Sequence, residues 1–213
     1  MKTDELIESL GNYVEPVKAT RLRKSLMMSL SAGIGVTLCL MLAVFGVPAY
    51  TFGRAEFHLQ AVALVFTLSL VAIGAHFLVS VARPGEPGRK PLVLIGLVFL
   101  ALLSAGLIAL TFAPLAAWRA MLLSPQWSMC LICIPLFALA PFAALIWALR
   151  RAAPTHPALT GATAGLIAAA SSAAIFSCCI PGSSLPFVTL WYGGIILLCA
   201  LVGAIVSPRL LRW

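Results

Sequence analysis

Charged residues are scarce in this chain. Lys, Arg, Asp and Glu together make up 9% of its 213 residues, whereas 62% of the residues are hydrophobic. A soluble domain carries about 25% charged residues, because its surface must interact with water. The scarcity therefore excludes a soluble globular domain and indicates an integral membrane protein.

The long apolar runs also lack the groups that carry membrane chemistry. They contain no Asp, Glu, Lys or Arg, and only one histidine, His76. Ion and substrate pathways through a bilayer are usually marked by such groups. The sequence shows no nucleophile paired with a base and no glycine-rich phosphate loop. These absences argue against transport, hydrolysis and nucleotide chemistry.

Six apolar runs are each long enough to cross a hydrocarbon core of roughly 30 Å, which takes about 20 helical residues. The predicted fold class is therefore an all-α integral membrane protein with six transmembrane helices, and residues 25–213 form the transmembrane domain. The predicted spans are Leu26 to Val47, Gln60 to Val81, Pro91 to Phe112, Cys130 to Leu149, Leu159 to Phe176 and Phe187 to Val206.

Basic residues concentrate at the N-terminus, in alternate loops and at the C-terminus. They are Lys2, Lys18, Arg21, Arg23, Lys24, Arg83, Arg89, Lys90, Arg150, Arg151, Arg209 and Arg212. The first and third loops carry only Arg54 and Arg119. The positive-inside rule then predicts that both termini lie in the cytoplasm. Because the basic residues form no patch interleaved with aromatics, the net charge of +8 does not indicate direct nucleic-acid binding.

Residues 1–24 form the one substantial polar segment and are predicted to be cytoplasmic. Asp4 and Glu5 would lie in the first turn of a short helix, where carboxylates favour the helix dipole, and Glu8 faces away from the apolar side. The apolar stripe comprises Leu6, Leu10, Tyr13 and Val14, joined loosely by Ile7. Such a stripe requires a protein groove or the lipid interface as partner, although a fraying tail on the membrane is the simpler alternative.

Two patterns describe packing inside the bilayer. Pro135 and Pro141 fall within the fourth span, where each removes a backbone donor and is expected to bend the helix. Small residues recur every four positions in the fifth span, which predicts a face for close helix packing. They are Gly161, Gly165, Ala169 and Ala173.

Two cysteine pairs are predicted to lie at the outer side. Cys130 and Cys133 are three residues apart at the start of the fourth span, so both thiols lie on one helix face. Cys178 and Cys179 are adjacent in the predicted fifth loop. Because the outer side of a bacterial inner membrane is oxidising, thiols that meet there can form a disulfide or react with oxidants.

Three interpretations of these cysteines stay open. The first is a permanent disulfide between the fourth helix and the fifth loop. The second is a redox-responsive or metal-responsive site, in which Cys130, Cys178 and Cys179 bind a soft ion, although adjacent thiols diverge and disfavour a four-thiolate zinc site. The third is a set of unrelated apolar cysteines, as expected for the mid-span Cys39 and Cys199.

A quinone-coupled thiol oxidoreductase is an alternative function for a multi-span protein with several cysteines, and a small transporter of the inner membrane is another. A disulfide-forming enzyme needs thiol pairs that exchange electrons with a quinone and with a soluble thiol partner. Here the Cys130 and Cys133 pair is embedded at a helix start, and no extended outer loop presents a second pair.

Several short motifs, in this order and spacing, resemble the NrsF family of negative regulators of sigma F. They are residues 1–8 (MKTDELIE), Cys130-Leu131-Ile132 leading through Pro141 to residues 147–154 (WALRRAAP), residues 186–193 (PFVTLWYG) and residues 208–213 (PRLLRW). The resemblance extends along the whole chain and includes the number of spans.

The resemblance implies a membrane anti-sigma factor, without enzymatic activity or a cofactor. Such a protein sequesters an extracytoplasmic-function sigma factor and releases it under metal or oxidative stress. The family's two outer cysteines correspond to Cys130 and to either Cys178 or Cys179. This chain departs from the pattern by an extra thiol beside each position and by Ile180 to Ser184 where acidic residues are expected, which weakens the case for carboxylate-assisted metal binding.

The leading hypothesis assigns a role to each end of the protein. The N-terminal helix would dock on a basic, apolar sigma surface through Asp4, Glu5, Leu6, Ile7, Glu8 and Leu10. The stress signal would enter at Cys130 and at Cys178 or Cys179. It would then reach Arg150 and Arg151 through the fourth helix.

Overall fold

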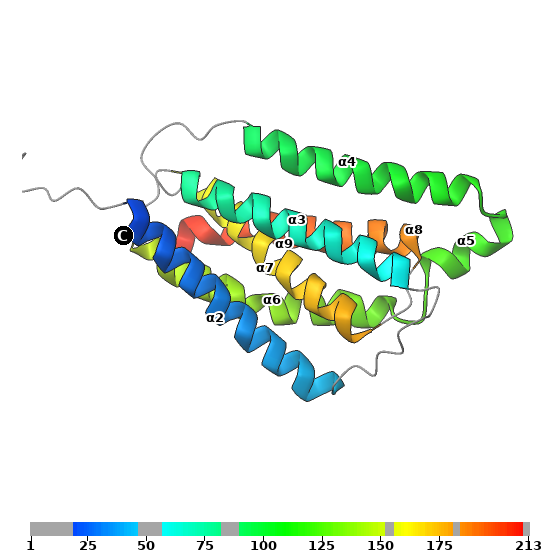
Figure 1. Cartoon of the computed structure of the whole chain (residues 1–213), viewed down its shortest axis with the longest axis horizontal. Helices are drawn as coiled ribbons and strands as arrows, with labels where there is room; N and C mark the ends of the chain where they lie inside the picture. The colour runs from blue at the N-terminus through cyan, green and yellow to red at the C-terminus, as the bar shows by residue number, and fades with distance from the viewer. Residues whose placement is uncertain (1–18, 47–56, 82–89, 152–155, 181–183, 211–213) are drawn as a thin grey trace, which may run out of the picture.

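The computed structural model describes residues 19–46, 57–81, 90–151, 156–180 and 184–210, which are almost entirely helical (Figure 1). Six helical stretches are long and apolar enough to cross a membrane, so the all-α class is confirmed and the number of candidate spans is the predicted six. Four are single helices: α2 (Ala19–Phe45), α3 (Phe57–Val81), α4 (Lys90–Thr111) and α7 (Pro157–Cys179). The others are composite, joining α5 (Leu115–Leu122) to α6 (Trp127–Arg150), and α8 (Leu185–Phe187) through the π-helix η1 (Val188–Tyr192) to α9 (Gly193–Leu210).

Helix α7 lies at the centre of the bundle and is buried along most of its length, packed against α9, α3 and α6 (Figure 1). Its small side chains make this position possible. Gly161 lies against the backbone of Gly203, and Gly165 lies against the backbone of Cys199 on α9. The four-residue repeat of small residues is therefore a packing face, as predicted, and it places two helix backbones in direct contact.

Helix α6 contains Pro135 and Pro141 without interruption of the helix. In a regular helix the N–H of residue 141 would donate to the carbonyl of Phe137, and proline cannot donate. The Thr37 hydroxyl of α2 donates to this carbonyl instead, over 3.1 Å. A hydroxyl from a neighbouring helix thus supplies the missing hydrogen bond, which is how membrane helices tolerate an internal proline.

Two elements were not predicted from the sequence. Helix α5 forms part of the third loop, and the indole N–H of its Trp118 donates to the Ala113 carbonyl over 3.2 Å. The π-helix η1 follows α8 in the sixth span. Its Thr189 hydroxyl lies 3.2 Å from the Leu102 carbonyl of α4 and 3.0 Å from the Leu185 carbonyl, and Gly106 of α4 leaves room for this side chain.

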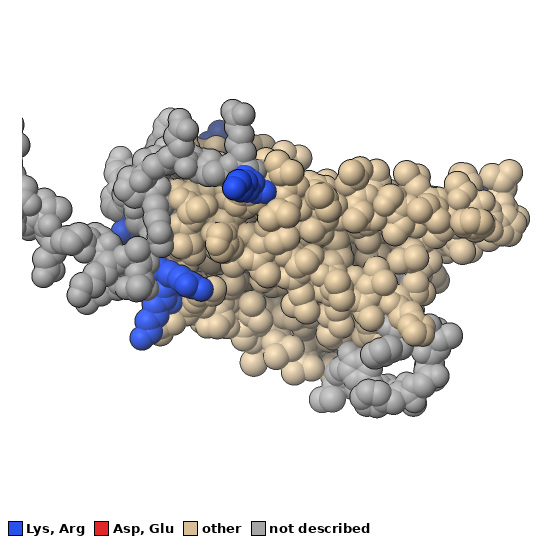
Figure 2. Space-filling model, turned by 45° about the horizontal axis from the view of Figure 1, so that its top comes forward, with Lys and Arg blue, Asp and Glu red and all other residues tan. Residues whose placement is uncertain are grey.

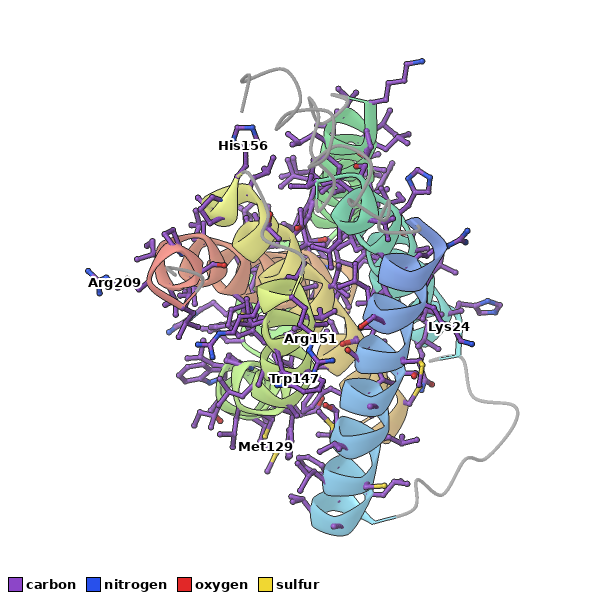
Figure 3. All side chains as sticks on the ribbon, turned by 90° about the vertical axis from the view of Figure 1, so that its left-hand side faces the viewer. Lys24, Met129, Trp147, Arg151, His156 and Arg209 are labelled. Carbon is purple, nitrogen blue, oxygen red and sulfur yellow. The ribbon has the colours of Figure 1, made fainter. Side chains whose placement is uncertain are left out.

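One end of the bundle, called the basic end below, carries Lys24, Lys90, Arg150, Arg151 and Arg209 (Figure 2). The start of α2 and the end of α9 lie at the same end (Figure 1). Figure 3 shows Lys24, Arg151 and Arg209 around this end, on three different helices. The Arg150 Nε–H donates to the Leu210 carbonyl over 3.0 Å, and the Arg151 guanidinium lies 4.1 Å from the centroid of the Trp147 ring. The orientation of this end toward the cytoplasm stays a prediction.

Candidate thiol site

The opposite end of the bundle, the thiol end, is built on the first turns of α6 and the last turn of α7. Helix α6 begins after the turn at Gln126, and the Cys130 N–H donates to the Gln126 carbonyl over 3.0 Å. Cys130 faces the bundle and is 0% exposed, whereas Cys133 is half-buried. The two thiols therefore differ in access, although their spacing places them on the same side of the helix.

Cys178 and Cys179 lie in the last turn of α7, so their predicted place in the fifth loop is wrong. The helix continues through Ser177, Cys178 and Cys179, about one turn beyond the predicted end of the span at Phe176. The Gln60 amide of α3 donates to the Ser177 carbonyl over 2.9 Å, and the Ile180 N–H donates to the Phe176 carbonyl over 3.1 Å. These bonds satisfy backbone groups at the end of the helix.

Tyr192 occupies the space that the α6 and α7 thiols share. It is 1% exposed, belongs to the same buried core as Cys130, and lies near Cys178. Its ring packs on Phe176, with the ring centroids 6.3 Å apart. Cys130 and Cys178 therefore lie near one common neighbour, and Cys179 packs against the same apolar core that contains Cys130 and Tyr192. Sequence reasoning missed Tyr192.

Aromatic side chains and α5 cover this end. Trp127 and Trp191 lie with ring centroids 5.4 Å apart, and Phe45 of α2 meets Phe176 edge-on at 6.1 Å. The Trp191 indole N–H donates to the Leu122 carbonyl over 2.9 Å. The Ser184 hydroxyl donates to the Met121 carbonyl over 2.7 Å. Helix α5 is thereby tied to the start of the sixth span.

All six cysteines lie in described helices, and each is a thiol rather than half of a disulfide. Within the described ranges, no three side chains of His, Cys, Asp or Glu are grouped closely enough to hold a metal ion. Cys199 is half-buried as expected, but Cys39 is exposed on α2, so its predicted role as a core residue is wrong. Its side chain faces outward because α2 buries only the stripe that meets α6.

The residues predicted to bind a partner lie outside the described part of the chain. Asp4, Glu5, Leu6, Ile7, Glu8 and Leu10 all precede Ala19, the first described residue. Their helix and its docking role stay predictions.

Comparison with known proteins assigns the family. Residues 10–213 match the NrsF family, described as negative regulator of sigma F. The chain belongs to the NrsF family. It is 30% identical, over the full length of both chains, to the anti-sigma-F factor NrsF of Caulobacter vibrioides. It is 28% identical, again over both full lengths, to the probable anti-sigma-F factor NrsF of Azospira oryzae. No solved structure matches the chain.

Membership in the NrsF family helps to decide between the three functions considered for this chain, an anti-sigma factor, a thiol oxidoreductase and a transporter. An NrsF protein is an anti-sigma factor that regulates transcription, which favours a regulatory role over the oxidoreductase and transporter alternatives. The family match begins at residue 10, so Leu10 is the one residue of the predicted docking stripe that lies within it.

Proposed function

We propose that this protein holds an extracytoplasmic-function sigma factor inactive at the cytoplasmic face of a bacterial inner membrane. The observation that carries the proposal is the NrsF match over residues 10–213. The six apolar helices and the segregation of Lys and Arg at the basic end support a membrane location with both termini inside. The sigma factor would bind at that end.

The N-terminal segment is the proposed sigma-binding element. It is contiguous with α2, whose first described residue, Ala19, lies at the basic end (Figure 1). Leu6, Ile7 and Leu10 would bury an apolar stripe in the partner, with Asp4, Glu5 and Glu8 facing basic groups. Each buried aliphatic side chain contributes about 1.5 to 3 kcal/mol before ordering costs reduce the total. The capture is then strong enough to repress and weak enough to reverse.

Release is proposed to begin at the thiol end, which would face the periplasm. Cys178 and Cys179 are half-buried and Cys130 is buried, so an oxidant reaches the α7 thiols first. A peroxide-type oxidant would convert the Cys178 thiol to a sulfenic acid, and Cys130 would then attack that sulfur to give a disulfide and water. A soft metal ion would act differently, displacing the protons of the same two thiols and bridging them. Either event draws the start of α6 and the end of α7 together around Tyr192.

Co-purification tests the sequestration proposal. The full-length protein, co-expressed in turn with the extracytoplasmic-function sigma factors of the same genome, is expected to retain one such sigma factor on an affinity resin after detergent extraction. It is also expected to repress a promoter that depends on the sigma factor. A full-length protein that neither retains nor represses the sigma factor would refute the proposal.

Paired substitutions in the N-terminal segment test the docking stripe. The double variant Leu6→Asp with Leu10→Asp is expected to lower sigma retention at least about tenfold, because two aliphatic contacts are replaced by charges. Ser9→Asp adds a charge outside the stripe and is expected to retain the sigma factor like wild type. Equal retention by both variants would place the binding surface elsewhere in the chain.

A further inference from the structure

Helix α2 is attached to the bundle by one narrow stripe. Its buried residues are Leu26, Leu30, Gly33, Thr37 and Met41, and the residues between them are exposed or half-buried. The spacing of three and four residues is the pattern by which two helices pack side by side at a small angle. The stripe lies mainly on α6, with fewer contacts to α7 and α3. The position of α2 therefore depends chiefly on α6.

The stripe connects the two ends of the bundle. Near the basic end, Leu26 and Leu30 share an apolar cluster with Leu145 and Leu149 of α6. Near the thiol end, Met41 lies in the same core as Cys130. Phe45, the last residue of α2, meets Phe176 of α7 edge-on.

The middle of the stripe packs against the turn of α6 that contains Pro141. Gly33 lies so close to Pro141 that a Cβ atom would meet the Pro141 Cα. One turn along α2, the Thr37 hydroxyl donates to the Phe137 carbonyl, which Pro141 leaves without a donor in its own helix. Most of the other contacts in the stripe are apolar and permit sliding or rotation. A hydrogen bond to a fixed carbonyl is directional, so it sets the register of one helix on the other.

The basic residues at the end of α6 are already engaged elsewhere. Arg150 donates to the Leu210 carbonyl of α9, and the Arg151 guanidinium lies over Trp147 of its own helix (Figure 3). The Arg150 bond links the end of α6 to α9, whereas the Arg151 contact lies within the end of α6 itself. Helix α2, by contrast, directly follows residues 1–18 in the chain and contacts α6 through Gly33 and Thr37.

We propose that α2, and not the Arg150–Arg151 end of α6, carries the signal from the thiol end to the N-terminal segment. In this mechanism the hydrogen bond from Thr37 to the Phe137 carbonyl holds α2 in the register that retains the sigma factor. A displacement of the first turns of α6 around Tyr192 strains this bond and lets α2 shift. The inference rests on the proposed function for its output, but the register of α2 can be measured without a sigma factor.

Two matched pairs of variants test this role in cells. Thr37→Val keeps the shape of the side chain but removes the donor, and Thr37→Ser keeps a hydroxyl. Gly33→Ala pushes α2 away from the Pro141 backbone, whereas Gly35→Ala enters open space. Thr37→Val is expected to raise unstressed sigma-dependent transcription about three- to tenfold, the range for one interhelical hydrogen bond, and Gly33→Ala is expected to raise it as well. Thr37→Ser and Gly35→Ala are expected to stay within about twofold of wild type at equal membrane levels.

A second measurement reports the register of α2 on α6 in the absence of the sigma factor. Lys24→Cys places a thiol at the exposed start of α2, and a membrane-impermeant maleimide labels it in inside-out vesicles from cells lacking the sigma factor. Adding Thr37→Val is expected to change the labelling rate, and adding Thr37→Ser is not. Equal labelling and equal transcription for the Val and Ser variants would overturn the inference. If Thr37→Val alters the labelling but the wild-type protein never represses a sigma factor, the proposed function is refuted, and the inference that Thr37 sets the register of α2 still holds.

Discussion

Replacing Gly165 by valine is expected to prevent stable folding of the transmembrane bundle. A Cβ atom at this position would meet the Cys199 carbonyl oxygen, and it would lie 3.1 Å from the Cys199 carbonyl carbon and 3.3 Å from the Ala200 Cα. These are backbone atoms, so α7 and α9 must separate to admit any side chain. Because this is the most extensive helix pair in the described structure, the expected loss is about 3 kcal/mol or more. Monodisperse yield in detergent and the thermal unfolding midpoint measure it.

The matched control is Gly96→Val on α4. A Cβ atom at Gly96 would meet nothing within 4 Å, and the residue is exposed on the outside of the bundle. This variant adds the same side chain to a membrane helix without forcing two backbones apart. It is expected to match wild type in yield and to lie within about 1 kcal/mol of it in stability. A Gly165→Val protein as stable as Gly96→Val would show that α7 and α9 do not need their close approach.

Hydropathy was sufficient to predict the six spans, because apolar length is the property that a bilayer selects. The small-residue face of α7 could also be predicted from the sequence, because Gly and Ala at every fourth position are typical of a face where helices pack closely. Helix α5 could not be predicted in this way. Leu115–Leu122 is too short to span a membrane, and contacts with Trp191 and Ser184 stabilise the helix. The π-helix at Val188–Tyr192 depends on tertiary contacts of Thr189 in the same way.

The candidate site was predicted only in outline. Charge bias placed Cys130 and Cys178 toward the same end, and the helix ends agree with that placement. Spacing could not choose between Cys178 and Cys179, because the choice depends on how the end of α7 is rotated toward Tyr192. Tyr192 itself was visible in the sequence within the motif PFVTLWYG, but its burial follows from the π-helix, which local pattern does not reveal.

Cys130→Ser is expected to abolish stress-induced release of the sigma factor while leaving repression intact. Cys130 is 0% exposed and shares the neighbourhood of Tyr192 with Cys178, so it is the thiol on α6 placed to complete a disulfide or to bridge a soft metal ion. Serine fills nearly the same volume, but its hydroxyl cannot form a disulfide and does not bridge a soft metal ion. A sigma-dependent reporter, measured with and without a thiol oxidant or cadmium ions, is expected to lose at least about 90% of its induction at unchanged basal level, a tenfold effect that corresponds to about 1.4 kcal/mol.

Single replacements of the other cysteines identify the partner thiol. Cys178→Ser is expected to reproduce the loss of induction, because Cys178 shares Tyr192 with Cys130, whereas Cys179→Ser and Cys133→Ser are expected to retain most of it. Cys39→Ser on the outer face of α2 is the control for thiol loss remote from the site. If Cys179→Ser abolishes induction and Cys178→Ser does not, Cys179 is the partner thiol of Cys130. If Cys130→Ser responds like wild type, the buried thiol is a packing residue, and the stress signal must enter elsewhere in the protein.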